Sequence, residues 1–259
     1  MQFLANEFNQ HSLCEITTFV FKLNCIMRLK FVLSFLLIVF SAAGFSQVKP
    51  FRFGVRVAPN IAWISPDTKD YKNEGMQLGF SWGFMADITL TENYFIKTGF
   101  NIDYLNGKLS YPYQVDYDDV MPVIVTGTMN RKYNLRYIEL PLTLKMRTNQ
   151  FGNKAYFGEI GFGTSLNLKA RGKDEFVPDD GSASTSSEND IKDDISLFKE
   201  SLIIGGGIEF FIDESTSIVT SLAFNNGLTN ILNGNDYVDP SLKQRANLYY
   251  FQLSIGILF

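Results

Sequence analysis

The last eleven residues, Tyr249–Phe259 (YYFQLSIGILF), decide the fold. Large apolar side chains alternate with small or polar ones along this stretch, and the chain ends on phenylalanine. The apolar face carries Tyr249, Phe251, Leu253, Ile255, Ile257 and Phe259. An alternation with a period of two residues predicts a β-strand with one apolar face. Because a tilted strand of about 9–11 residues spans the core of a bilayer, this stretch predicts a membrane-crossing strand.

The same alternation recurs in eight segments from Phe51 onward, and we find no amphipathic helix between them. The segments are Phe51–Trp63, Gln77–Leu90, Tyr94–Asn106, Lys132–Met146, Lys154–Lys169, Ser201–Asp213, Thr216–Leu228 and Asn247–Phe259. An even number of strands returns the C-terminus to the side on which the first strand begins. The sequence therefore predicts an all-β fold, an eight-stranded antiparallel up-and-down transmembrane β-barrel.

The expected connections alternate between short and long. Short turns fall at residues 91–93, 147–153 and 213–215, and long polar stretches at residues 64–76, 107–131, 170–200 and 229–246. Short periplasmic turns and long extracellular loops are typical of outer-membrane barrels. The third long stretch is acidic and rich in serine, so we expect it to be mobile.

We expect one face of every strand to be apolar and free of charge. Examples are Leu78, Phe80, Trp82, Phe84, Ala86, Ile88 and Leu90 in the second strand and Ile138, Leu140, Leu142, Leu144 and Met146 in the fourth. The opposite face carries ten charges: Arg52, Arg56, Lys97, Lys145, Lys169, Asp87, Asp103, Glu139, Glu159 and Glu209. A Lys or Arg facing lipid at mid-membrane costs about 2–4 kcal/mol, so these charges are expected to face the lumen.

The interior of an eight-stranded barrel has just enough room for side chains. The five basic and five acidic residues therefore predict a closed network of ion pairs. The alternative is that some of them form a proton relay or a catalytic site. Strand-end aromatic residues predict girdles at the two membrane interfaces: Trp63, Trp82, Tyr94, Tyr104, Tyr137, Tyr156, Tyr249 and Tyr250.

The N-terminus has the order of a secretory signal peptide. Basic residues 27–30, an apolar run over residues 31–40 and small residues 41–44 predict a signal peptide at residues 27–46, cleaved after Ser46. Residues 1–26 then form an upstream extension from a misplaced start, and residues 47–259 form the outer-membrane barrel domain. We expect export to the outer membrane.

Loss of the leader removes the residues that most active sites need. His11, Cys14 and Cys25 are the only histidine and cysteines, and all three precede Met27. Disulfides, thiol nucleophiles, Ser-His catalysis and Cys/His metal sites are thereby excluded from the mature chain. We predict no catalytic, cofactor-binding or metal-binding residues and no cofactor. The net charge of −4 and the lack of a basic stripe exclude a nucleic-acid partner.

The most specific local string is Arg136–Lys145 (RYIELPLTLK). Together with the signal peptide, the strand count, the glycine-rich fifth strand and the terminal Phe259, it resembles the PorT-like family of eight-stranded outer-membrane β-barrel proteins. Some members of that family are linked to protein secretion, and it has no catalytic motif to carry over. Because proline in a strand implies an edge or a bulge, Pro141 predicts a bulge.

The expected function is that of a non-enzymatic integral outer-membrane barrel, an accessory of protein secretion or envelope assembly that acts through its extracellular loops. The expected partners are outer-membrane lipid and lipopolysaccharide, the barrel-assembly machinery through Phe259, and secretion-system or envelope proteins. Two alternatives remain at this stage. One is a secreted lipocalin-like carrier of a small apolar ligand, and the other is a barrel enzyme with a carboxylate-only site that includes Asp103 or Glu139.

Overall fold

The computed structural model describes residues 51–116, 124–181 and 183–259. These residues belong to one compact unit, Phe51–Phe259. The predicted upstream extension at residues 1–26 and the signal peptide at residues 27–46 lie outside the described residues. The same holds for His11, Cys14 and Cys25.

Ten antiparallel strands and one short 3-10 helix make up the described chain. They are β1 (Phe51–Pro66), β2 (Lys72–Asn73), β3 (Gln77–Thr91), β4 (Tyr94–Asp116), β5 (Ile124–Arg147), β6 (Lys154–Pro178), β7 (Thr185–Asp190), η2 (Lys192–Asp194), β8 (Phe198–Phe211), β9 (Ser217–Gly227) and β10 (Ala246–Leu258). No helix within the described ranges is long and apolar enough to cross a membrane.

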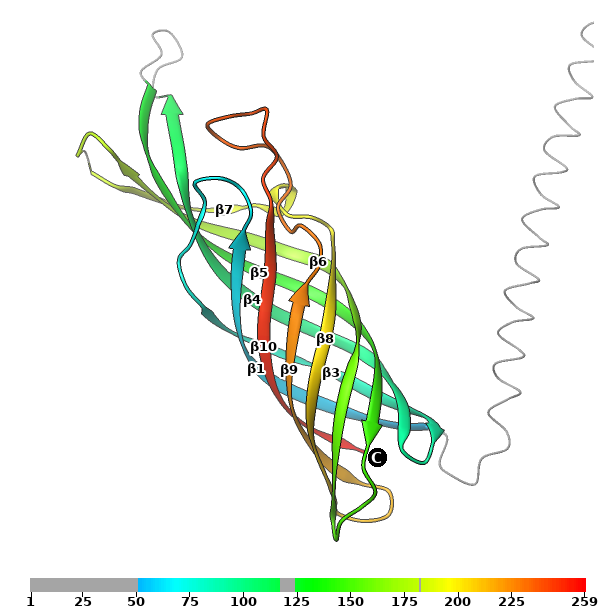
Figure 1. The fold of residues 1–259 in the computed structure, drawn as a ribbon. Coiled ribbons are helices and arrows are strands. Elements are labelled where there is room, and N and C mark those ends of the chain that lie inside the picture. Colours follow the sequence, from blue (N-terminus) through cyan, green and yellow to red (C-terminus); the bar gives the residue numbers. More distant parts are fainter. Residues whose placement is uncertain (1–50, 117–123, 182) are drawn as a thin grey trace, which may run out of the picture. The chain divides into compact units, whose positions relative to one another are not determined.

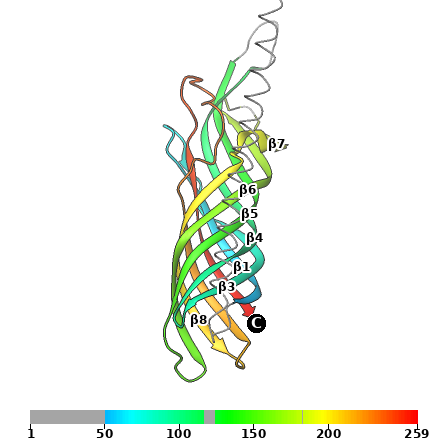
Figure 2. The same ribbon diagram turned by 90° about the vertical axis from the view of Figure 1, so that its right-hand side faces the viewer.

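Eight of the ten strands form a closed ring. The order of hydrogen-bonded neighbours is β1-β3-β4-β5-β6-β8-β9-β10, and β10 pairs with β1 through contacts such as Gly54↔Leu258. Figures 1 and 2 show these strands tilted around a common axis. The two additional strands are short: β2 pairs with β4, and β7 pairs with β6. The predicted eight strands correspond to the ring, and the described residues form ten strands in total.

The connections segregate to the two ends of the ring. At the turn end, Glu92-Asn93, residues 148–153 and residues 212–216 join neighbouring strands, and Phe51 and Phe259 lie there too. The loop end carries residues 67–76, 179–184, 191–197 and 228–245, together with the tips of β4 and β5. The connections are thus grouped at two ends as expected, but the expected contrast in length holds only in part. Residues 67–76 and 228–245 are long, whereas the connection at residues 179–184 is as short as the turn at residues 148–153.

Two of the predicted loops are mostly strand. Residues 107–116 and 124–131 belong to β4 and β5, which stay paired from Asn106↔Asn134 to Asp116↔Ile124. In the stretch 170–200, β6 continues to Pro178, and β7 pairs with it from Arg171↔Asp190. The error has a simple cause: both faces of these extensions carry many polar residues, so the sequence lacks the apolar face by which the other strands were found.

Burial alternates along the strands as predicted. The outward side chains of β3 and β10 are exposed, for example Leu78 at 74% and Leu253 at 58%, whereas Asp87, Asp103 and Glu209 in the lumen have no exposed surface. The facing of the apolar and charged residues is confirmed at these positions. A soluble lipocalin-like carrier needs the opposite arrangement, an apolar cavity and a polar exterior.

Pro141 does not form the predicted bulge. It pairs with Gly163 of β6 without a register shift. On its other side, residues 140–142 do not pair with residues 98–100 of β4, although the register is the same before and after this gap. Because proline has no N–H to donate, it interrupts the ladder toward β4 and leaves the alignment of the strands unchanged.

The bulge lies instead near the loop end of β5 and β6. Arg136 pairs with Lys169 and Tyr137 pairs with Asn167, so Leu168 is unpaired. A bulge of one residue reverses the alternation, which places Lys169 on the outer face beside the exposed Arg136. The predictions that Lys169 faces the lumen and that the apolar face of the fourth strand carries no charge are therefore wrong.

Candidate functional site

Four charged residues form a network across the lumen at the turn end. This turn-end network consists of Arg52 on β1, Asp87 on β3, Lys145 on β5 and Glu209 on β8. The Lys145 Nζ atom lies 2.6 Å from Asp87 Oδ2 and 3.2 Å from Glu209 Oε2. Arg52 donates hydrogen bonds to both carboxylates. Because β1 and β3 are separated from β5 and β8 in the ring, these ion pairs link separate parts of the wall.

Two further ion pairs extend this network. Lys97 lies 2.7 Å from Glu159, and Arg147 lies 3.6 Å from Glu209. The Lys145 ammonium also lies 4.6 Å from the ring centre of Phe157, within the range of a cation–π contact. Asp87, Glu159 and Glu209 are thus each paired with a cation. The predicted closed network of ten charges forms only in part, because among the described residues Asp103 and Arg56 make no ion pair and Lys169 faces outward. These ion pairs connect opposite parts of the wall across the lumen.

A second cluster surrounds Glu139 in the middle of the lumen. The Tyr250 hydroxyl donates a hydrogen bond of 2.9 Å to Glu139 Oε2, and Ser165 donates one of 3.4 Å. Lys199 lies 3.8 Å from the same oxygen and is fully buried. Tyr137 and Tyr250 have no exposed surface, so the prediction that both belong to an interfacial girdle is wrong. They point inward because they share the face of the luminal charges.

The lumen gives a substrate little access to these carboxylates. Asp103 and Glu139 were the candidates for a carboxylate-only catalytic site, and both are buried. The cavity beside Glu139 has a volume of about 20 Å³, which is enough for a single water molecule. Among the described residues, no three His, Cys, Asp or Glu side chains could together hold a metal ion. The predicted lack of catalytic and cofactor residues stays a prediction.

Apolar side chains plug the lumen at the loop end. Residues from the connections fold inward onto the upper parts of the strands and form one buried cluster with them. The inward residues from the connections are Tyr71, Ile191, Ile195, Ile231 and Leu232, and their partners on the strands include Leu105, Leu109, Tyr111 and Leu135. This plug was not predicted, because these connections lie in polar stretches that were expected to be loops. The isolated isoleucines within polar stretches were the available signal.

A buried arginine ties the plug to the wall. Arg131 on β5 makes two hydrogen bonds to Asp174 on β6, at 2.7 and 2.8 Å, and lies 3.0 Å from Asp194 of η2. Burial lowers the pKa of Arg131, but its hydrogen bonds to Asp174 raise that pKa well above the ordinary value. Tyr237, from the connection between β9 and β10, lies 3.4 Å from the Arg131 guanidinium. The connection and η2 are thereby anchored to the barrel wall.

Stacked tyrosines complete the plug. The rings of Tyr71 and Tyr111 are stacked with centres 4.8 Å apart, and the ring of Tyr237 also stacks on Tyr111, with centres 5.3 Å apart. Burial raises the pKa of the Tyr111 hydroxyl well above its usual range, so this group stays protonated. These three tyrosines come from β4 and from the connections that follow β1 and β9, so the stack holds separate connections together.

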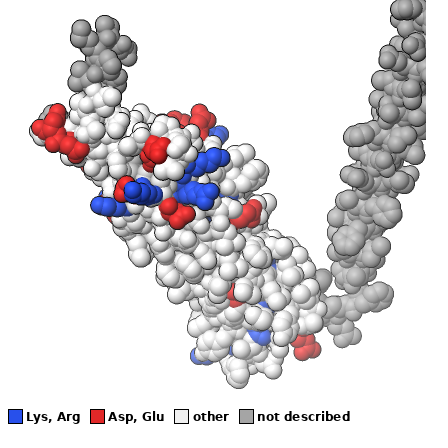
Figure 3. Space-filling view, turned by 45° about the horizontal axis from the view of Figure 1, so that its top comes forward, with Lys and Arg blue, Asp and Glu red and all other residues white. Residues whose placement is uncertain are grey.

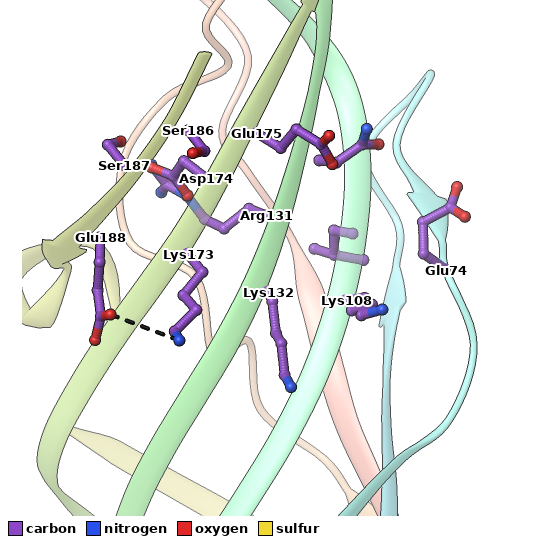
Figure 4. A pocket seen from close by; sticks show the side chains of 12 residues that line it. Glu74, Lys108, Arg131, Lys132, Lys173, Asp174, Glu175, Ser186, Ser187 and Glu188 are labelled. Atoms are coloured by element: carbon purple, nitrogen blue, oxygen red, sulfur yellow. Dashed lines mark hydrogen bonds and ion pairs between the residues drawn. The ribbon is translucent and has the colours of Figure 1, made fainter. Parts of the chain in front are cut away.

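A concave surface lies on the outer face of the ring. This outer cleft has a volume of about 640 Å³ and is formed over β4, β5 and β6, between β2 and β7. Its lining includes Lys108, Lys132 and Lys173, which are cross-strand neighbours. Figure 4 shows the three lysines side by side, with an ion pair from Lys173 to Glu188 on β7 at 3.6 Å.

Charge on the visible outer surface is concentrated near this cleft. On the face drawn in Figure 3, lysines, arginines and acidic residues gather toward the loop end, and the part of the surface between them and the turn end is almost free of charge. The middle part corresponds to the exposed apolar side chains of the strands. The protein thus presents an apolar band and, next to it, a charged and indented end.

Three proteins of known structure are similar to this chain. Neisserial surface protein A (NspA) has 11% sequence identity, covers 81% of this chain and 96% of its own, and gives a TM-score of 0.46. OprG from Pseudomonas aeruginosa has 8% identity with coverages of 81% and 95% and a TM-score of 0.41. Ail of Yersinia pestis has 13% identity with coverages of 82% and 100% and a TM-score of 0.35. No curated protein matches the sequence.

A family model matches most of the chain. It describes the outer membrane protein beta-barrel domain, and the match covers residues 45–233. That range includes the first seven strands of the closed ring, with their outward apolar and inward charged side chains. The chain therefore belongs to the family of outer membrane proteins with a beta-barrel domain.

Proposed function

We propose that the protein is a non-enzymatic, eight-stranded transmembrane barrel of the outer membrane, and that it acts through its loop end as an accessory of protein secretion or envelope assembly. In this proposal the turn end faces the periplasm, the loop end faces outward, and residues 27–46 are removed as a signal peptide. The family match supports the location. The string Arg136–Lys145, which resembles PorT-like proteins, supports the link to secretion.

The observation that carries the proposal is the filled lumen. The turn-end network, the Glu139 cluster and the plug occupy it at three levels. Ions or substrates that entered from the loop end would first have to displace the plug from its contacts with Arg131 and the stacked tyrosines. A barrel without an open path contributes to the envelope through its outer surfaces.

The loop end offers the surface that such a role needs. Strands β4, β5 and β6 run 23, 24 and 25 residues, whereas about 9–11 residues cross a membrane. The residues of β4, β5 and β6 beyond this length extend past the apolar band as paired strands, and they form the outer cleft. Secretion or envelope proteins are the proposed partners at this end. The proposed partner of Phe259 is the barrel-assembly machinery, and lipid and lipopolysaccharide contact the outer wall.

Conductance measurements test the filled lumen. The purified protein is inserted into planar bilayers, and insertion is verified by a difference in gel mobility between unheated and boiled samples. The expected result is a stable baseline without discrete current steps. Regular single-channel steps from folded protein would show an open path and would refute this reading of the lumen.

Site-specific photocrosslinking in intact cells tests the accessory role. A crosslinking amino acid replaces Ser187 in the outer cleft, and Ser241, an exposed residue on the connection between β9 and β10, provides the matched control. The expected result is an adduct with a discrete secretion or envelope protein at Ser187 and not at Ser241. If folded protein gives no adduct at Ser187, the cleft is not the partner-binding surface.

A further inference from the structure

Six basic side chains share the outer face at the loop end of β4, β5 and β6. We call them the basic patch: Lys108, Lys132, Arg136, Lys169, Arg171 and Lys173. Lys132 is the direct cross-strand neighbour of both Lys108 and Lys173. Arg136 is likewise the direct neighbour of Lys169. Like charges directly opposite each other in antiparallel strands repel, so this arrangement works against the stability of the free protein.

Most of these charges have no acidic partner. Arg171 and Lys173 share Glu188, at 3.5 and 3.6 Å. Within the described parts of the chain, the ammonium groups of Lys108, Lys132 and Lys169 make no hydrogen bond and no ion pair, in contrast to the paired lysines of the lumen. Arg136 lies over the ring of Tyr104 at 4.7 Å. The basic patch therefore has unused capacity to bind anions.

The basic patch begins where the apolar band ends. Tyr104 pairs with Arg136, and the next outward residues toward the turn end are Ile102 and Ile138. Toward the loop end, Lys132 lies four residues from Arg136 on the same strand, which is a distance of about 13 Å. Aromatic residues mark the interface between hydrocarbon and headgroups. The basic patch thus covers the depth at which the headgroups of the outer leaflet lie.

We propose that the basic patch binds the phosphate groups of lipopolysaccharide in the outer leaflet. This inference rests on the proposed outer-membrane location with the loop end outward. Two strand spacings of about 4.8 Å separate Lys108 from Lys173, so several cations face a headgroup that carries more than one phosphate. Ammonium and guanidinium groups bind phosphate through charge-assisted hydrogen bonds. Bound phosphate also relieves the repulsion between Lys108, Lys132 and Lys173.

The flanking acidic residues make the site selective. Glu74 and Glu188 border the outer cleft on its β2 and β7 sides, and Glu175 lies beyond the lysines. A long polyanion such as a nucleic acid would meet these carboxylates as well as the lysines. A lipid headgroup approaches from the apolar band, where Arg136 and Lys169 come first. This geometry favours a membrane-anchored phosphate over a soluble polymer.

A binding experiment on the refolded full chain tests the proposal. Fluorescent lipopolysaccharide is titrated with protein in zwitterionic detergent, and binding is followed by anisotropy. The variant Lys108→Gln/Lys132→Gln/Lys169→Gln is compared with Lys69→Gln/Lys192→Gln/Lys243→Gln, which removes three exposed lysines elsewhere at the loop end. Parallel titrations use lipopolysaccharide treated with phosphatase, and inorganic phosphate serves as a competitor.

At low ionic strength the patch variant is expected to bind lipopolysaccharide about a hundredfold more weakly, since three positive charges near anionic phosphate groups are lost. The control variant should stay within about twofold of the wild type. Phosphatase treatment should weaken wild-type binding, and free phosphate should not compete at low millimolar concentration. Equal affinity for intact and dephosphorylated lipid, or equal affinity of the two variants, would overturn the proposal. Competition by free phosphate would assign the patch to a soluble anion instead.

The two proposals can fail separately. Heat-dependent gel mobility reports whether each variant is a folded barrel. If the folded protein does not bind lipopolysaccharide, only the phosphate site is refuted, and the proposed outer-membrane barrel is unaffected. Failure of the wild-type protein to fold in detergent or lipid would refute the barrel itself. The comparison of intact and phosphatase-treated lipopolysaccharide uses the wild-type protein, so it does not depend on the folding of any variant.

Discussion

Replacing Lys145 with methionine tests whether the turn-end network stabilises the barrel. Methionine retains most of the side-chain volume and the packing on Phe157 but removes the charge that lies 2.6 Å from Asp87 and 3.2 Å from Glu209. Two buried carboxylates would then share Arg52. Removing one partner of a buried ion pair costs about 3–5 kcal/mol. Because Arg147 lies 3.6 Å from Glu209 and compensates in part, we expect a loss of about 3 kcal/mol.

The assay is unfolding by urea in lipid vesicles, followed by the fluorescence of Trp63 and Trp82. The free energy of unfolding is obtained by linear extrapolation. Lys154→Met is the matched control, since Lys154 is an exposed residue at the turn end, and it should change stability by less than about 0.5 kcal/mol. A loss below about 1 kcal/mol for Lys145→Met would show that the turn-end network does not stabilise the barrel, because a buried unpaired carboxylate costs more than that.

A double variant separates the ion pair from general damage to the core. Adding Glu209→Gln to Lys145→Met removes one carboxylate as well as one cation, so that Arg52 pairs with a single carboxylate, Asp87. The double variant should therefore lose about 1–2 kcal/mol less than the sum of the two single losses. Strict additivity would show that Lys145 and Glu209 do not interact in the folded protein.

Three further outcomes are expected. Ile160→Lys places a charge on an outward side chain that is 45% exposed, and it should lower the folded yield in vesicles because a lysine facing lipid costs about 2–4 kcal/mol. The control Ile160→Leu should fold normally. Equal yields of the two variants would show that Ile160 does not face the lipid. Deletion of Phe259, which pairs with Phe53 through two backbone hydrogen bonds, should slow assembly in cells, and unchanged kinetics would refute its role as a signal. Tyr237→Ala removes a ring from the plug and should speed protease cleavage within residues 228–245, with an unchanged cleavage rate as the contrary result.

The sequence was informative wherever one face of a strand was apolar. The alternation in Tyr249–Phe259 and in the second strand predicted strands and facing, because lipid and lumen place opposite demands on neighbouring residues. The same logic failed at Lys169. A single unpaired residue, Leu168, reverses the alternation there, and a bulge of this kind depends on pairing with β5 that one strand alone does not reveal.

The loop end was the least predictable part. Strand β4 continues through Leu109 and Tyr111, whose side chains enter the plug, while Lys108 and Ser110 alternate with them. This sequence pattern differs little from that of a polar loop with scattered apolar residues, so it did not predict a strand. The partner of Arg131, Asp174, is 43 residues away, so no local pattern could link the two. The candidate surface is therefore a product of strand pairing more than of any motif.

The pairing of β1 with β10 has a consequence for biogenesis. One edge of β1 pairs with β3, but its other edge pairs with β10, about 200 residues later in the chain, since Val55 aligns with Ile257. Both strands expose unsatisfied backbone groups until they meet, and such open edges invite aggregation. Contacts between such distant positions also form slowly. The newly exported chain must consequently be kept apart from other chains until β10 has arrived, and a product truncated before β10 could never close the ring.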